Sequence, residues 1–123
     1  MQNTILKRFV LISISVISAL MLNGCWTDFP IETPDLQKVS GGTYIGEYKA
    51  GPVRVKAEVQ VLNHTIMEVK ILEHDNGLGK KAEVITNSII KNQSLDVDVV
   101  SGATLSSKVI LKAVEIGLKV GIK

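Results

Sequence analysis

The sequence predicts a small α+β domain in which an antiparallel sheet is covered by two helices. Residues 53–61 alternate apolar and polar side chains, which is the period of a strand with one buried and one wet face. Residues 80–92 and 104–120 instead repeat apolar side chains at the three- and four-residue spacing of amphipathic helices. A sheet with one apolar face needs helices of this kind to cover it, and this combination defines the fold class.

The beginning of the chain has the pattern of an export signal. Lys7 and Arg8 precede an apolar run over residues 9–22, which is short for a membrane span. The run ends at Leu22-Asn23-Gly24-Cys25, which resembles the lipobox of bacterial lipoproteins. The resemblance implies a lipoprotein signal peptide over residues 1–24, acylation of Cys25 and attachment to the membrane, facing outside the cytoplasm. A membrane-spanning anchor and an unmodified cysteine remain alternatives.

Residues 25–42 are expected to form a linker between this cysteine and the domain. The segment contains Pro30, Pro34 and small residues at 40–42, a composition that disfavours helix and strand and is typical of a spacer. The domain itself is then expected to span residues 43–123.

Three strands should open the domain as a meander. The first is expected at 43–48, the second at 53–61 after a turn at 50–52, and the third at 66–72 after a turn that contains an exposed His64. The face of this sheet that is expected to be buried carries Val53, Val55, Ala57, Val59, Val61, Val69 and Ile71.

Two helices and a short strand are expected to complete it. A helix over 80–92 should bury Ala82, Ile85 and Ile89, and residues 97–100 are expected to form an edge strand. The last helix, 104–120, should pack on the sheet through one stripe: Leu105, Val109, Ala113, Ile116 and Val120. Four charged residues of this helix should face away: Lys108, Lys112, Glu115 and Lys119.

Charge and composition exclude several classes of function. The chain has 14 basic and 12 acidic residues, and removing Lys7 and Arg8 with the export signal leaves 12 of each. A neutral domain with few aromatic residues lacks the basic, stacking surface that nucleic-acid binding needs. One cysteine and two histidines supply neither a disulfide nor an obvious metal-ligand cluster. Because no nucleophile–base set, P-loop or Rossmann fingerprint is present, catalysis by side chains alone is not supported.

The junction between the edge strand and the last helix has the composition of an anion site. A β-branched run ends at Ser101-Gly102, and the helix begins with Thr104. The first N–H groups of a helix lack intrahelical partners and lie at the positive end of its dipole. A phosphate beside this turn would therefore be stabilised without any basic side chain. Ordinary capping by Ser and Thr explains the same tetrapeptide and remains an alternative.

These residues also resemble the flavinylation motif of the FMN-binding domain family, Asp-x-x-(Ser/Thr)-Gly-Ala-Thr. Asp98, Ser101, Gly102, Ala103 and Thr104 fill every fixed position of the motif. The resemblance implies that Thr104 carries FMN through a phosphoester bond and that the other four residues belong to the cofactor site. It also implies that a secreted, Mg-dependent flavin transferase attaches the cofactor from FAD, with Asp98 read by that enzyme or helping to place its metal.

A second segment, Gly77-Leu78-Gly79, resembles part of a loop in the flavin subunits of the Rnf and sodium-pumping NADH:quinone oxidoreductase complexes. That loop reads His-x-Glu-Thr-Pro-Gly-Leu-Gly, and this chain lacks its Glu-Thr-Pro. The resemblance implies that Gly77, Leu78 and Gly79 lie against the isoalloxazine ring. A plain strand-to-helix loop is the alternative, and His74 is expected to end a strand rather than to catalyse.

The family resemblance implies an electron carrier outside the cytoplasm. A membrane dehydrogenase or another flavoprotein would donate the electrons, and extracytoplasmic acceptors would receive them. The alternative from another class is a non-redox binding module on the cell surface, also held by a lipid.

Overall fold

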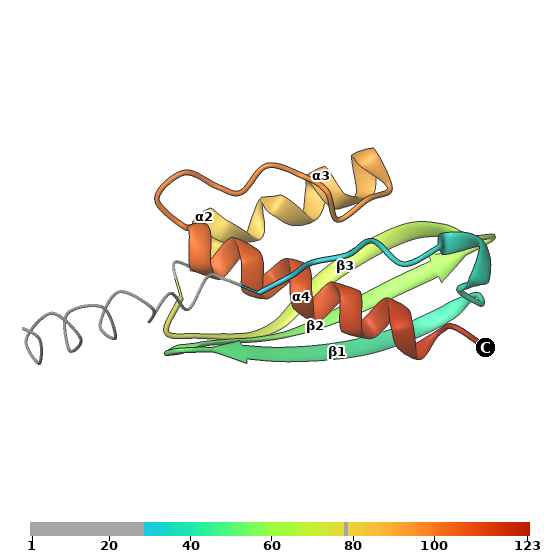
Figure 1. Cartoon of the computed structure of the whole chain (residues 1–123), viewed down its shortest axis with the longest axis horizontal. Helices are drawn as coiled ribbons and strands as arrows, with labels where there is room; N and C mark the ends of the chain where they lie inside the picture. The colour runs from blue at the N-terminus through green and yellow to red at the C-terminus, as the bar shows by residue number, and fades with distance from the viewer. Residues whose placement is uncertain (1–28, 78) are drawn as a thin grey trace, which may run out of the picture.

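The computed structural model describes residues 29–77 and 79–123 (Figure 1). Its three strands form one antiparallel sheet in the order β1-β2-β3: β1 (Gly42–Ala50), β2 (Val53–Leu62) and β3 (Thr65–Asp75). Asn63 and His64 join β2 to β3 with positive φ angles of 51° and 61°, as a tight hairpin turn requires. The predicted meander is confirmed, with each strand longer than the sequence pattern indicated. Among the described residues, no helix is long and apolar enough to cross a membrane.

The alternation along β2 places its apolar side chains in the core as predicted. All five of its predicted core residues are buried, and β3 adds the buried Val69 and the half-buried Ile71. Val69 pairs with Val59, and Ile71 pairs with Ala57, so both strands present the same face. The prediction of one buried and one wet face of the sheet is therefore confirmed.

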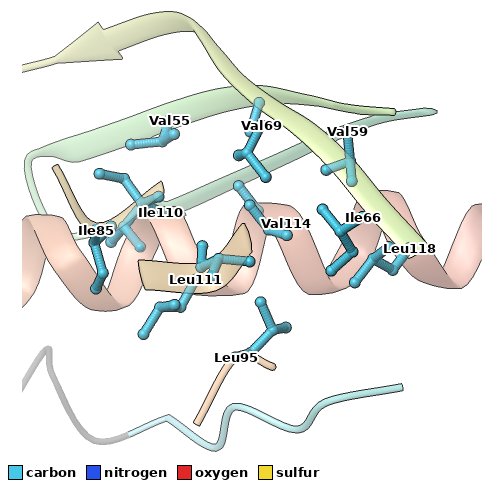
Figure 2. Close-up of a cluster of buried hydrophobic side chains, with 14 of the residues drawn as sticks. Val55, Val59, Ile66, Val69, Ile85, Leu95, Ile110, Leu111, Val114 and Leu118 are labelled. Atoms are coloured by element: carbon cyan, nitrogen blue, oxygen red, sulfur yellow. The ribbon is translucent and has the colours of Figure 1, made fainter. Parts of the chain in front are cut away.

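Helix α4 (Thr104–Val120) packs across β1 and β2 and has the predicted bounds. Figure 2 shows Ile110, Val114 and Leu118 between this helix and the sheet. The predicted apolar stripe is only partly right, because Val120 is 63% exposed. The sheet covers one side of the helix while α2 and residues 29–39 pack near another, so its buried surface is wider than one stripe.

The helix predicted over 80–92 is two helices, α2 (Gly79–Glu83) and α3 (Ile85–Asn92). At the break, the Asn87 N–H donates to the Val84 carbonyl, which is the tighter three-residue spacing of a 3₁₀ turn. The three apolar residues predicted to face inward are nevertheless buried: Ala82, Ile85 and Ile89.

The edge strand predicted at 97–100 is wrong. Residues 96–100 belong to no strand. The Val100 N–H donates to Ser107 Oγ at 3.1 Å, so a side chain of α4 satisfies it in place of a neighbouring strand. Upstream, the Leu95 N–H donates to Thr33 Oγ1 at 3.0 Å, which fixes the segment to the N-terminal part of the domain.

The described part of the predicted linker, residues 29–41, packs on the domain instead of standing apart as a spacer. Val39 is fully buried and pairs with Ile122 in an isolated antiparallel bridge, just after the short helix η1 (Leu36–Lys38). The Phe29 ring lies 5.1 Å from the Tyr48 ring, centroid to centroid. Proline and glycine content alone did not reveal this packing, which depends on scattered apolar side chains.

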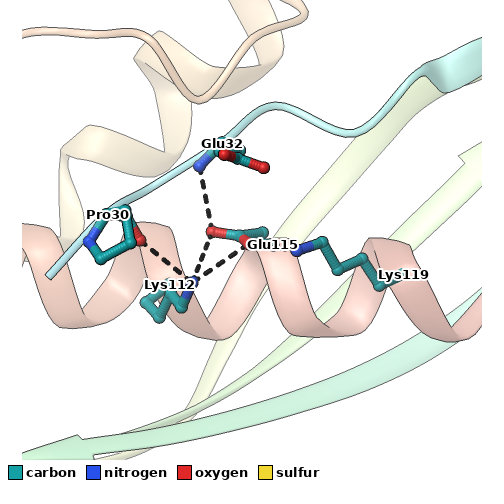
Figure 3. A network of polar contacts seen from close by, with 5 residues as sticks. All are labelled: Pro30, Glu32, Lys112, Glu115 and Lys119. Carbon is teal, nitrogen blue, oxygen red and sulfur yellow. Dashed lines mark hydrogen bonds and ion pairs between the residues drawn. The ribbon is translucent and has the colours of Figure 1, made fainter.

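Glu115 of α4 holds this N-terminal segment in place, and the prediction that it faces away is wrong (Figure 3). Its side chain is 1% exposed. The carboxylate accepts hydrogen bonds from Lys119 Nζ at 2.6 Å, from Lys112 Nζ at 3.1 Å and from the Glu32 N–H at 3.1 Å. Lys112 Nζ also donates to the Pro30 carbonyl at 3.0 Å. Residues 30–32 thus cover a charged group that the helix pattern alone places in water.

Replacing Glu115 by Gln should destabilise the fold at neutral pH by about 1–2 kcal/mol, because charge-assisted hydrogen bonds are lost. Burial, the largest single influence, would raise the pKa of Glu115. The hydrogen bonds from Lys119, the Glu32 N–H and Lys112 together outweigh burial and hold the pKa below its ordinary value of 4.5. A lowered folded pKa gives stability that is present above the unfolded pKa and is lost as the pH falls through the folded pKa.

The difference between wild type and Glu115→Gln should therefore be full at pH 7 and shrink progressively below about pH 4.5. Urea unfolding at several pH values measures it. Glu68→Gln, at an exposed position on β3, is the matched control and should unfold like wild type throughout. Equal stability of wild type and Glu115→Gln at pH 7 would contradict the role of the buried carboxylate.

Candidate functional site

A surface hollow of about 270 Å³ lies where α4 begins. Three separate parts of the chain line it: the β1–β2 turn, the loop after β3 and the start of α4. The lining residues are Pro52, Val53, Asn76, Gly77, Gly102, Ala103, Thr104, Leu105 and Ser106. The fold thus brings one residue of the predicted glycine loop to the predicted anion-binding turn.

Thr104 is the first residue of α4, and it is exposed at the rim of this hollow. The N-cap position of α4 is occupied by Ala103, whose side chain makes no capping hydrogen bond. The first intrahelical bond runs from the Ser107 N–H to the Ala103 carbonyl at 2.9 Å, so the N–H groups of Thr104 and Leu105 lie ahead of the first bond of the helix ladder. Hydroxyl capping, the ordinary explanation for this tetrapeptide, is not what the structure shows.

Gly102 sets the direction in which the chain enters α4. The Ala103 N–H donates to the Val100 carbonyl at 2.9 Å, which closes a turn with Ser101 and Gly102 at its centre. Gly102 has a φ of 76°, the positive value that the third position of a type II turn requires and that glycine adopts without strain. The turn therefore needs glycine at this position and leaves Thr104 in the open.

A basic side chain that no motif in the sequence indicates also reaches this turn. The Nζ of Lys81 lies 3.0 Å from the place where a Cβ on Gly102 would be. The turn therefore has a basic side chain beside it, in addition to the helix N–H groups on which the predicted anion site depends. Lys81 is remote from the motif in sequence and approaches it only because α2 packs against α4.

Gly77 forms one wall of the hollow, and a residue with a side chain would not fit at this position. A Cβ at this position would collide with the His74 imidazole and would lie 2.7 Å from Ser106 Oγ. The neighbouring Asn76 has a φ of 57° and Gly79 a φ of 34°, so the loop turns sharply. Leu78 lies outside the described residues. Glycine at 77 lets the loop backbone lie directly on the His74 ring.

His74 lies near the end of β3, as predicted. Its side chain is 4% exposed, and neither ring nitrogen has a hydrogen-bond partner among the residues that the structure describes. Nδ1 is 3.6 Å from Glu83 Oε1. In the described part of the chain, no group of three or more His, Cys, Asp or Glu residues is placed to hold a metal ion.

The remaining predicted residues lie around the hollow. Asp98 and Ser101 are exposed but do not line it, and Gly79 begins α2. The hydrophobic walls at Pro52 and Val53 were not anticipated. The only sequence signal for them was the predicted turn at 50–52, which does not indicate that a hairpin end would meet the start of a distant helix.

Comparison with known families decides what this site belongs to. A family model described as the FMN-binding domain matches residues 49–119, a range that contains every residue lining the hollow. The chain belongs to the FMN-binding domain family. No curated protein matches it.

The residues of this FMN-binding domain fit the group that the family name implies. FMN joins a flat aromatic ring to a phosphate. Val53, Leu105 and the bare backbone of Gly77 offer the hollow apolar and close-approach surfaces for a ring. The N–H groups of Thr104 and Leu105 at the start of α4 and the Lys81 ammonium offer donors and charge for a phosphate. Since ligand pockets usually measure about 300–1,000 Å³, part of a bound FMN would extend outside this hollow.

Proposed function

We propose that this FMN-binding domain is a membrane-anchored electron carrier outside the cytoplasm, with FMN attached covalently to Thr104. It receives electrons from a membrane dehydrogenase or another flavoprotein and passes them to extracytoplasmic acceptors. The observation that carries the proposal is the position of Thr104 at the rim of the hollow, exposed and at the first residue of α4. Family membership supplies the cofactor, and this hydroxyl supplies a reachable point of attachment.

The attachment step that this implies is a phosphoryl transfer without oxidation or reduction. The Thr104 hydroxyl oxygen attacks the FMN phosphorus of FAD, a new P–O bond forms, and the bond to the AMP half breaks. AMP leaves, and the hydroxyl proton passes to a base of the transferase or to water. A secreted, Mg-dependent flavin transferase is the proposed catalyst. Asp98 and Ser101 are exposed, so a second protein can reach both, with Asp98 read by the transferase or placing its metal.

The chain's own residues then hold and orient the cofactor. The N–H groups of Thr104 and Leu105 and the positive dipole end of α4 stabilise the phosphate at Thr104. Gly77, the residue of the glycine loop that lines the hollow, would lie against the ring. When bound, the flavin supplies the redox chemistry, and the shallow hollow leaves part of it open to partners. A covalent bond retains the cofactor outside the cytoplasm, where a dissociable one would be lost by dilution.

Membrane attachment is proposed from the sequence at Leu22-Asn23-Gly24-Cys25, which lies outside the described residues. Acylation of Cys25 after removal of residues 1–24 would supply the anchor. The packed segment from Phe29 onward leaves only a short length of chain between this anchor and the domain. The flavin would therefore stay close to the membrane surface, where a membrane dehydrogenase could reach it.

One experiment tests the cofactor and the anchor together. The full chain co-expressed with a flavin transferase should make the membrane fraction yellow, and dithionite should bleach the flavin absorbance reversibly. Cys25→Ala should move the same yellow protein to the soluble fraction after export, because the acyl chains supply the anchoring. A colourless wild type would favour the non-redox binding module. A yellow Cys25→Ala protein that stays wholly in the membrane would contradict the lipid anchor.

A further inference from the structure

We propose that the Lys81 ammonium binds the phosphate of FMN carried on Thr104. This inference rests on the proposed function, since it concerns the phosphate that attachment would place there. It adds a cofactor-binding residue that lies outside the motif and outside the glycine loop.

The geometry of the turn leads to this proposal. Lys81 Nζ lies 3.0 Å from the Cβ position of Gly102, and Gly102 lines the hollow two residues before Thr104. Since Gly102 has no side chain, nothing on this residue separates the ammonium from the turn's surface. A side chain at this position would push the ammonium away.

The backbone that carries Lys81 is held beside the start of α4. The next residue, Ala82, is fully buried, and α2 packs against α4. The flexible stem of the lysine then has only the short distance across the turn to cover. A point charge on such a stem can meet a phosphate oxygen without a fixed hydrogen-bond geometry.

Lys81 is also available for an anion. Lys112 and Lys119 share the Glu115 carboxylate, whereas among the described residues no carboxylate lies within ion-pair distance of Lys81. The nearest acidic neighbour on the same helix, Glu83, has its Oε1 3.6 Å from His74 Nδ1. The positive charge of Lys81 is therefore not neutralised by a neighbouring side chain.

A phosphate diester on Thr104 supplies the missing partner. Such a diester keeps one negative charge at neutral pH, and the only charged side chain within residues 98–104 is the acidic Asp98. The N–H groups of Thr104 and Leu105, at the positive end of α4, would bind this charge from one side, and Lys81 would bind it across the turn. The two contributions together would fix the phosphate and hence the direction in which the ring leaves Thr104.

Lysine labelling tests the contact without any electron-transfer assay. The full chain is made with and without the transferase, treated briefly with an amine-acylating reagent, and analysed by fragment mass spectrometry. Flavinylation should slow the labelling of Lys81 by about two- to fivefold, as an exposed ion pair of up to 1 kcal/mol implies. Lys80, the adjacent exposed lysine on α2, is the internal control and should label equally in both forms.

The phosphorus resonance of the flavinylated protein gives a second measurement. Its chemical shift should depend on salt in wild type and much less in Lys81→Gln, because salt screens exposed charges. Lys81→Arg should restore the salt dependence, and Lys80→Gln should behave like wild type. Equal Lys81 labelling with and without FMN on Thr104, or the same salt dependence in Lys81→Gln, would overturn the inference alone. If no FMN is found on Thr104, the proposed function itself fails.

Discussion

Thr104→Ala should abolish the covalent flavin while leaving the fold intact. Alanine has no hydroxyl oxygen, so the phosphoester cannot form at this position, and the loss should be complete. The fold should survive because Thr104 is exposed and the N-cap position of α4 is occupied by Ala103 instead. The free energy of unfolding should change by less than about 1 kcal/mol, the usual cost of a lost cap.

Thr104→Ser is the matched variant, since it keeps a hydroxyl at the same place and should still accept FMN. Flavin absorbance after denaturation and removal of free cofactor measures attachment, and urea unfolding measures stability. Ser106 and Ser107 offer other hydroxyls in the first two turns of α4, but both are buried and should not replace Thr104. An Ala variant that stays as yellow as wild type after denaturation would rule out attachment at this residue.

Gly46→Ala should be among the most destabilising single changes in the domain. Gly46 is buried on β1, where α4 lies against the sheet. A Cβ there would collide with the Ala113 carbonyl oxygen and would lie 2.5 Å from the Gly117 nitrogen. Both are backbone atoms, so they can give way only if the whole helix moves. We expect a loss of about 3 kcal/mol, the upper end for overpacking a well-filled core.

The same change should also disturb the site, because α4 carries Thr104 at its start. Gly41→Ala is the control, since its Cβ would meet only the Val61 carbonyl oxygen at 3.6 Å, an ordinary contact. The urea midpoints of the two variants and wild type make the comparison. If Gly46→Ala unfolds at the same urea concentration as Gly41→Ala, the close approach of helix and sheet is not as the structure describes.

The parts of the fold that depend on local pattern were predictable. The alternation along β2 predicts its start and its buried face, because a strand has a side-chain period of two. The start of α4 at Thr104 follows from the Ser101-Gly102 turn that precedes it. Each of these features is decided by neighbours within a few positions of the chain.

The predictions that were wrong concern residues whose surroundings are supplied by segments that are distant in the sequence. The helix pattern predicts that Glu115 is solvated, but residues 30–32 pack over it in the structure. The β-branched residues within 97–100 predict a strand, but the Val100 N–H donates its hydrogen bond to Ser107 Oγ instead of to a neighbouring strand. No period in the sequence reveals such contacts.

The candidate site divides in the same way. The turn at 101–104 and the glycine at 77 could be predicted from the sequence, and the structure brings them to one hollow. The walls at Pro52 and Val53 and the ammonium of Lys81 could not, because a hairpin end and a separate helix supply them. Only the packing of α2 and the β1–β2 turn around the start of α4 assembles the complete surface.

Peptide mapping of the full chain co-expressed with a flavin transferase and FAD tests the attachment most directly. The intact mass should rise by that of one FMN less one water, and fragment spectra should place the added mass on Thr104. An unmodified Thr104 under these conditions, or FMN found on a different residue, would contradict the proposed function.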